Sequence, residues 1–411
     1  MLAAHLAYQL LDLLIAALAL WPCIRLADSR PARALGRRLP RLLGTPLRRR
    51  LLLGTALYVA VLLALLVATN SAAFDTLLAR LRASDRWQRA FSLSSFVALG
   101  AAWLGGTLLL PLVALWTAWR TPAATPLARL RRRRDRTLAT AFAAALFALF
   151  GYACFLEPNR LVVERARVEV ADWPAERPPL RIVLFSDLQS AYLGARERRV
   201  PELIAALEPD LIVIAGDLVA QSFDETTSLE QARWVLSRLA APLGVYVVNG
   251  DVDNVVANGI EAIVEGMPVT LLDNESVVLP CEPPIELLGI DPPRRARMAT
   301  ALAQPAKAEL RLGLVHRPRH WAELSAAGCA LVMAGHTHGG QVVVPGFGPP
   351  VTFEIVPRHV AAGGLHRMSE TTQLYVTRGV GREGGFAPQI RILCPPEITL
   401  IELHGSASAT H

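Results

Sequence analysis

Two hydrophobic patterns divide the chain. Before residue 157, long apolar stretches follow one another with few polar interruptions, at Leu6–Ala27, Leu51–Thr69, Phe91–Trp119 and Thr137–Leu156. Each is close to the ~20 residues that a helix needs to cross the hydrocarbon of a bilayer. A signal peptide would need a basic start, and Met1–Leu10 holds no Lys or Arg. The pattern therefore predicts an N-terminal transmembrane region of four helices over residues 1–156.

From about Val162 the chain changes to short β-branched runs separated by Pro, Gly and helical segments. Strands are predicted at Val162–Val170, Arg181–Phe185, Leu211–Ala215, Gly244–Val248, Glu286–Ile290, Leu312–Val315, Ala330–Ala334, Gln341–Val344, Gln373–Thr377 and Ile398–Leu403. Helices are predicted at Arg196–Leu207 and Leu229–Leu239. Strands that alternate with helices are typical of a layered α/β core. We therefore expect an α/β domain over residues 157–404 and a loose tail over residues 405–411.

Charge is distributed unevenly between these two parts. Residues 1–156 contain twenty Arg and five Asp, a formal charge of +15, whereas the whole chain is +7, so the remainder carries about −8. The basic balance therefore belongs to the apolar part. Because the globular part is acidic, the composition argues against a nucleic-acid partner.

The arginines also predict an orientation. Nine of them fall in residues 25–50 and seven in residues 120–136, whereas the loop over residues 70–90 holds four Arg and two Asp. Basic residues accumulate in cytoplasmic loops. We therefore expect a multi-pass protein of the cell (inner) membrane, with the two Arg-rich loops in the cytoplasm. The globular domain would then be extracytoplasmic and held against the lipid bilayer.

Polar residues with metal-binding side chains follow the predicted strands of the globular part. They are Asp187, Asp217, Asp251, His316, His336 and His338. In open α/β sheets the ligand crevice lies outside the carboxyl ends of the strands. A single Asp after a strand is most often a turn residue or a helix cap. Six such residues in this order instead predict one cleft in which they converge.

This set of side chains suits the hydrolysis of a phosphate ester. Two divalent ions about 3.5–4 Å apart would activate a water and clamp the phosphoryl oxygens. Carboxylate, amide and imidazole groups are ligands for such ions, and Gln189 adds an amide two residues after Asp187. Gly335-His336-Thr337-His338-Gly339-Gly340-Gln341 is the most informative run, since two imidazoles in a glycine-rich loop have little packing rationale.

In their order these motifs resemble the calcineurin-like metallophosphoesterases, in particular a membrane-anchored bacterial branch. The family pattern runs Asp-x-His, Gly-Asp, Gly-Asn-His-Asp, a His, and Gly-His-x-His. Its counterparts here are Asp187-Leu188-Gln189, Gly216-Asp217, Gly250-Asp251-Val252-Asp253, His316 and Gly335-His336-Thr337-His338. The resemblance covers about residues 160–404. It implies an α/β/β/α sandwich that binds two divalent metals. Asp187, Gln189, Asp217 and His338 would hold one metal; Asp217, as the bridge, would hold the other with Asp251, His316 and His336.

The chain departs from the family pattern at three motif positions. Gln189 stands in place of a metal-binding His, and Asp251 in place of Asn. Together these changes make the site richer in oxygen and one charge more acidic, which favours Mn²⁺ or Mg²⁺, with Fe and Zn²⁺ as alternatives. Val252 stands in place of the family's catalytic His. A valine provides no proton, and general acid catalysis is typically worth roughly 10²–10⁴-fold.

The resemblance implies a membrane-anchored hydrolase that cleaves a phosphodiester or pyrophosphate bond by attack of a metal-bridging hydroxide. Its substrate would be a phosphorylated or lipid-linked molecule. The catalytic residues would be Asp217 and, as a substitute for the missing His, Asp253. The alternative is a metal-binding but catalytically weakened scaffold or binding module at the membrane.

Overall fold

The computed structural model describes residues 125–189, 193–220, 225–291, 295–352, 354–382 and 389–405, with isolated positions at 107, 111–112, 115 and 119. The chain forms two compact units, one of residues 1–153 with 386–388 and one of residues 154–385 with 389–411.

The first unit is described mainly through helix α8, Pro126–Gly151. Helical structure continues through a π-turn, Tyr152–Leu156, and a 3₁₀ turn, Glu157–Asn159. Among the described residues, one helix is long and apolar enough to cross a membrane: Arg132–Asn159, with a mean hydropathy of 2.0. This range includes the predicted fourth membrane helix, Thr137–Leu156. The other three predicted helices lie outside the described residues, apart from isolated positions in Phe91–Trp119.

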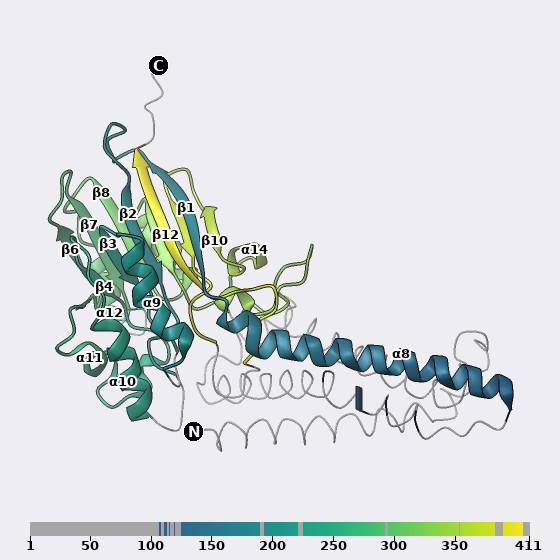
Figure 1. Cartoon of the computed structure of the whole chain (residues 1–411). Helices are drawn as coiled ribbons and strands as arrows, with labels where there is room; N and C mark the ends of the chain where they lie inside the picture. Colours follow the sequence, from purple (N-terminus) through teal and green to yellow (C-terminus); the bar gives the residue numbers. More distant parts are fainter. Residues whose placement is uncertain are drawn as a thin grey trace. The chain divides into compact units, whose positions relative to one another are not determined.

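The second unit is built on two six-stranded sheets (Figure 1). The strands of the first are, in spatial order, β1 Val162–Val170, β12 Glu397–Gly405, β2 Leu180–Phe185, β3 Leu211–Ile214, β4 Val245–Val247 and β5 Thr270–Leu271. Those of the second are β10 Gly364–Arg367, β11 Gln373–Val376, β9 Leu331–Ala334, β8 Leu310–Val315, β7 Ile285–Ile290 and β6 Glu275–Leu279. Nine of the ten predicted strand runs overlap these within one or two residues at each end.

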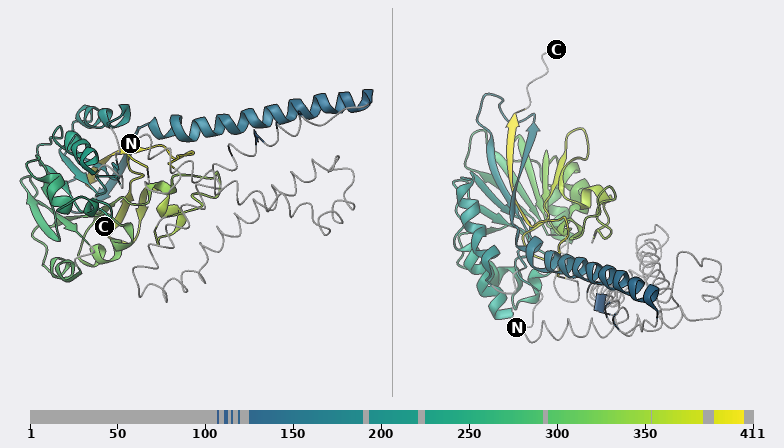
Figure 2. Two further views of the ribbon diagram at one scale, coloured as in Figure 1. Left: turned by 90° about the horizontal axis from the view of Figure 1, so that it is seen from below. Right: turned by 45° about the vertical axis from the view of Figure 1, so that its right-hand side comes forward.

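One core separates the two sheets and two more cover their outer faces. Leu184, Val213, Leu312 and Met333 belong to the cluster between the sheets. Helices α9 Ala195–Ala206, α10 Glu225–Leu236 and α11 Gly259–Val264 cover the first sheet, and α12 Arg295–Leu302, α13 Trp321–Ala326 and α14 Arg358–Ala361 cover the second. Figure 2 shows α9, α10 and α11, in teal, on one side of the strands. The domain is therefore a four-layered α/β/β/α arrangement.

The strand predictions failed in two ways. Gln341–Val344 is not a strand, because Pro345 and Gly346 turn the chain at once and leave only the isolated bridges Val342–Ile392 and Val344–Gly348. The sequence analysis also missed β5, β6 and β10. β6 and β10 are edge strands of the second sheet and β5 is an edge strand of the first. Edge strands carry a weaker apolar signal than central ones because one side of the ladder faces solvent.

Strand direction sets the place of the site. β2, β3 and β4 pair in parallel, as do β7, β8, β9 and β11, so their carboxyl ends lie at common edges. The loops that follow β2, β3, β4, β8 and β9 carry the predicted metal ligands.

Candidate metal centre

The predicted ligands sit on backbone that most side chains avoid. Five of the seven have a positive φ, namely Asp187, Gln189, Asp217, His336 and His338. A non-glycine residue in this region costs of order 1–3 kcal/mol and persists only where the surrounding structure holds it. Strand ends that turn sharply in this way aim side chains outward from the sheet edge.

Two glycines let these turns approach one another. A Cβ on Gly250 would overlap Asp217 Oδ1, and a Cβ on Gly335 would overlap the Ser186 side chain. The Gly-Asp and Gly-His motifs therefore need glycine at these positions, because the neighbouring loops leave no room for a Cβ atom. The loops after β2, β3, β4 and β9 form one packed edge.

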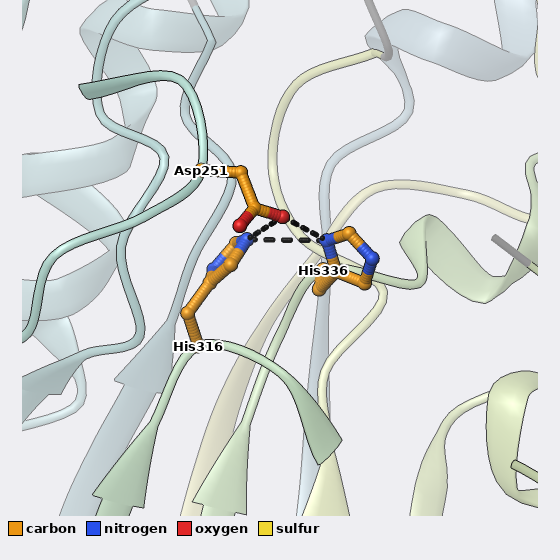
Figure 3. A group of neighbouring side chains, drawn as sticks. All are labelled: Asp251, His316 and His336. Carbon is orange, nitrogen blue, oxygen red and sulfur yellow. Dashed lines mark hydrogen bonds and ion pairs between the residues drawn. The ribbon is translucent and has the colours of Figure 1, made fainter. Parts of the chain in front are cut away.

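Three side chains from different strand ends face one another in Figure 3. Asp251 Oδ2 lies 3.0 Å from His336 Nδ1 and 3.5 Å from His316 Nε2, and the two imidazole nitrogens are 3.2 Å apart. Their ligand atoms lie within 4.8 Å of one another, a spacing that one metal ion can fill. These are three of the four residues predicted for the second metal.

The His316 ring is oriented with its Nε2 toward the cluster. Its Nδ1 lies 2.7 Å from the carbonyl oxygen of Ala215, which only accepts, so Nδ1 carries the proton and Nε2 faces the cluster. Nε2 lies 3.3 Å from Asp217 Oδ2. Burial lowers the pKa of His316, but Asp217 and Asp251 outweigh it and raise the pKa well above its usual value. The site therefore attracts positive charge.

Asp217 lies at the centre of the site. Its Oδ1 accepts from the backbone N–H of Val252 at 2.9 Å, and its Oδ2 accepts from Gln189 Nε2 at 3.0 Å. Asp187, Asp217 and His316 form a second group whose ligand atoms lie within 4.8 Å. His316 is the member common to both groups, and Asp217 Oδ2 lies 3.3 Å from its Nε2, so Asp217 borders the first group as well.

Buried oxygen atoms without hydrogen bonds fit a cation at this second group. Asp187 Oδ1 and Gln189 Oε1 are buried and accept no hydrogen bond among the described residues. Burial raises the pKa of Asp187 to about 6; His316 opposes this shift and Asp217 reinforces it. His338 Nε2 lies 3.4 Å from Asp187 Oδ1. Hard divalent cations take oxygen ligands of this kind, so the residues present fit such an ion.

His338 is kept neutral. It is fully buried, and burial together with the Arg391 guanidinium holds the pKa of its imidazole well below the usual value. Neutral imidazole is the form that ligates metals. Arg391 is itself buried and donates to backbone carbonyl groups, including those of His338 and Cys394. It therefore fixes the loop from which His338 reaches the site.

Asp253 has a different environment from the one expected of a proton donor. Its two oxygens accept from four backbone N–H groups, those of Asp217, Leu218, Val219 and Gly250, at 2.7–3.3 Å. Burial raises the pKa of Asp253 to about 7, with a further contribution from Asp217. These contacts describe a brace between the loops after β3 and β4. A catalytic role for Asp253 stays a prediction that this geometry does not favour.

The sequence analysis missed two charged residues at the site. Arg317 donates through Nε to Asp251 Oδ1 at 2.9 Å and approaches Oδ2 through Nη2 at 2.6 Å. Glu354 has a side chain that is 1% exposed and lies 3.8 Å from Arg317, 3.4 Å from Arg319 and 3.9 Å from His336. Arg317 could have been found from the sequence, because it directly follows the predicted ligand His316 and could balance the extra negative charge of Asp251. No sequence feature pointed to Glu354, because it lies in a long loop with no strand before it.

Comparisons with known proteins give a consistent picture. No family model matches the chain. Phosphodiesterase YaeI of Escherichia coli is 30% identical over 278 residues, 66% of this chain and 98% of that protein. A zebrafish transmembrane protein with metallophosphoesterase domain is 30% identical over 63% of this chain and 60% of its own length. The UDP-2,3-diacylglucosamine pyrophosphatase LpxG of Chlamydia trachomatis is 26% identical over 61% of this chain and 91% of that protein.

Proposed function

This chain belongs to the metallophosphoesterase family, and from that premise we propose that it is a membrane-anchored phosphoesterase that hydrolyses a phosphodiester or pyrophosphate bond. As a family member it is a metal-dependent hydrolase of phosphoric ester bonds. The observation that carries the proposal is the convergence of strand-end carboxylates and imidazoles around buried oxygen atoms that accept no hydrogen bond.

The ligand assignment is part of the proposal. Asp187, Gln189, Asp217 and His338 would hold one divalent ion, and Asp217, Asp251, His316 and His336 would hold the other, with Mn²⁺ favoured over softer ions. When bound, such ions lower the pKa of a water and neutralise charge on the phosphoryl oxygens. The protein's own contribution is orientation: Ala215 fixes His316, the Val252 N–H fixes Asp217, and Arg391 fixes the loop of His338.

Val252 limits the range of substrates. Its side chain is 7% exposed and apolar, and it stands where the family places a proton-donating His. Without that donor, departure of a poorly stabilised alkoxide is slow. Diesters of acidic alcohols and pyrophosphates have better leaving groups, so they are the favoured substrates. The same position supports the alternative of a weakened enzyme that only binds.

The membrane part of the proposal rests on sequence and on one helix. We place residues 1–156 in the bilayer as four helices, residues 157–404 outside the cytoplasm as the phosphoesterase domain, and residues 405–411 as a tail. The apolar Arg132–Asn159 helix supports this arrangement, since 11% of its most apolar window is buried. Reporter fusions after Leu156 test the orientation, and a cytoplasmic signal there would overturn it.

The activity is tested on the detergent-solubilised full chain. Metal content and turnover of bis-p-nitrophenyl phosphate with Mn²⁺ are measured for the wild type, Asp217→Asn, and Asp172→Asn as an exposed carboxylate control. We expect Asp217→Asn to lose metal and at least roughly 10²-fold in turnover, since it removes the bridging charge. A wild type with bound metal but no turnover on diester or pyrophosphate substrates would favour the scaffold alternative. Equal turnover in all three proteins would refute the assignment of Asp217 to a catalytic metal centre.

A further inference from the structure

Exposed apolar side chains of the second unit gather around the candidate metal centre. Seven large apolar residues of this unit are exposed in the part of the chain that the structure describes: Phe155, Leu156, Val278, Val344, Phe347, Ile355 and Leu393. All but Val278 lie on segments that contact the loops of the site. Single exposed apolar residues are ordinary on a soluble protein, but a group of them at one edge marks an interaction surface.

A tight turn after the His-x-His loop presents two of these residues. Val344 is 42% exposed and Phe347 is 55% exposed, and the backbone N–H of Val344 donates to Gly348 across the turn. Pro345 and Gly346 form the exposed tip. The guanidinium of Arg358 lies 4.0 Å above the Phe347 ring. The turn therefore projects an aromatic and an aliphatic side chain with a cation beside them.

Two further residues extend this surface toward the metal centre. Ile355 is 52% exposed and follows Glu354, whose carboxylate lies 3.9 Å from His336. Leu393 is also 52% exposed and follows Ile392, which exchanges backbone hydrogen bonds with Gln341 and Val343 at 2.9 Å. We call Val344, Phe347, Ile355 and Leu393 the apolar rim.

The chain enters the second unit at the same edge. β1 and β12 run in parallel from Val162 and Glu397, and β12 is antiparallel to β2, so β1 starts where β2 ends. Asp187 follows the end of β2, and its carbonyl accepts from Gly381 at 2.5 Å. The next residue, Arg382, donates to the carbonyl of Cys154 at 3.4 Å. Phe155 and Leu156, which are 64% and 66% exposed, therefore belong to the site edge of this unit.

We propose that the apolar rim seats in the headgroup layer of a lipid bilayer, so that the metal centre opens toward lipid phosphates. This inference rests on the proposed function and narrows its substrate to a phosphodiester or pyrophosphate of a membrane lipid. Phe155 and Leu156 argue for a bilayer as the occupant, because these exposed residues lie at the site edge of this unit and also end a helix that is long and apolar enough to cross a membrane. Arg358, whose guanidinium lies over the Phe347 ring, supplies a cationic group at the rim, which complements anionic headgroups.

Val278 provides an internal control. It is 41% exposed on the edge strand β6 and pairs with Glu286 near the start of β7. β7 runs parallel to β8, whose carboxyl end leads to His316, so Val278 lies toward the opposite end of the sheet. A bilayer that contacts the rim does not reach it.

The test uses the full chain in vesicles of phosphatidylethanolamine and radiolabelled phosphatidylglycerol. The photoreactive residue p-benzoyl-phenylalanine replaces Phe347, Leu393 or Val278 in turn. We expect lipid adducts at positions 347 and 393 to exceed those at 278 by at least about tenfold, the ratio that corresponds to about 1.4 kcal/mol of preference. Equal yields at the three positions, or adducts with a second copy of the chain, would overturn the proposal.

A second measurement separates this inference from the proposed function. In Phe347→Ser/Leu393→Ser, the ratio of turnover on a lipid pyrophosphate added to the vesicles to turnover on bis-p-nitrophenyl phosphate should fall about tenfold, since docking and not chemistry is weakened. An unchanged ratio would contradict the proposal that the apolar rim docks on the bilayer. If lipid adducts form while the wild type turns over neither substrate, the docking surface stands and the proposed function fails.

Discussion

Arg317 makes a bidentate ion pair with Asp251, in which Nε lies 2.9 Å from Oδ1 and Nη2 lies 2.6 Å from Oδ2. The motif that the sequence resembles has an uncharged Asn at the position of Asp251, and the guanidinium offsets the added charge. Burial raises the pKa of Asp251, but His316 and His336 outweigh this effect and keep its pKa well below the usual range. The carboxylate is therefore ionised and shared between an imidazole cluster and an arginine.

Arg317→Met should weaken substrate binding more than chemistry. The guanidinium lies beside the cluster and has further N–H groups for phosphoryl oxygens, and a charge-assisted hydrogen bond is worth about 1.5–3 kcal/mol. We expect KM for bis-p-nitrophenyl phosphate to rise roughly tenfold, with kcat changed less than about threefold. Steady-state kinetics at saturating Mn²⁺ measure both.

The double variant Asp251→Asn/Arg317→Met tests charge compensation. Removing both charges should be less harmful than the sum of the single changes, with a coupling on the order of 1 kcal/mol because both side chains are partly exposed. Arg317→Lys is the matched control, since Lys keeps the charge but lacks the paired donors. Additive effects, with Arg317→Lys equal to wild type, would contradict this role.

Val252→His should extend activity to monoesters. The change keeps the Val252 backbone N–H that donates to Asp217, and it adds an imidazole able to transfer a proton. We expect turnover of p-nitrophenyl phosphate to rise about tenfold or more, the low end of general acid catalysis. Val252→Gln is the control, because it is polar but transfers no proton. Equal activity of the two variants would argue against the assigned position.

Asp253→Asn distinguishes a brace from a proton donor. The substitution weakens hydrogen bonds to four backbone amides, so the free energy of unfolding should fall by about 1–3 kcal/mol and bound metal should decrease. Urea unfolding and metal analysis check both, with Asp172→Asn as the reference. Full stability and metal content together with a collapse of kcat would restore the catalytic interpretation.

Arg311 and Glu286 form a buried ion pair between β8 and β7, with side chains 2% and 0% exposed. Arg311→Met should cost about 3–5 kcal/mol because it leaves a buried carboxylate without its partner. Glu286→Leu/Arg311→Met should recover most of that loss. Denaturant unfolding of the three proteins measures the difference, and equal stability of the single and double variants would contradict the expected recovery.

The same pair predicts a pH dependence. Burial raises the pKa of Glu286, but hydrogen bonds from Arg311, Ser276 and Lys307 outweigh it and bring the pKa below the ordinary 4.5. A folded-state pKa below the unfolded value gives stability that is present above about pH 4.5 and is lost as the pH falls through the folded value. Between pH 7 and pH 3 the wild type should therefore lose more stability than Glu286→Leu/Arg311→Met, which lacks the titrating carboxyl group.

The layered α/β class, most of the central strands and the motifs of the site could be predicted from the amino-acid sequence alone. These features are local: an apolar run predicts a buried strand, and the polar residue after it lies at the strand end. The motif glycines could also be assigned to the site from the sequence, because each is adjacent to a predicted ligand.

The residues that surround those motifs could not be predicted in this way, because they depend on how the chain folds. The pairing of Arg317 with Asp251, the burial of Glu354 beside His336 and the brace at Asp253 join loops that are far apart in the chain, and no local pattern encodes them. The apolar rim is a further case, since Phe347 and Leu393 look like core residues in the sequence. Their exposure follows from the turn at Pro345-Gly346 and from the packing of residues 389–394 against it, which leaves no layer of protein above them among the described residues.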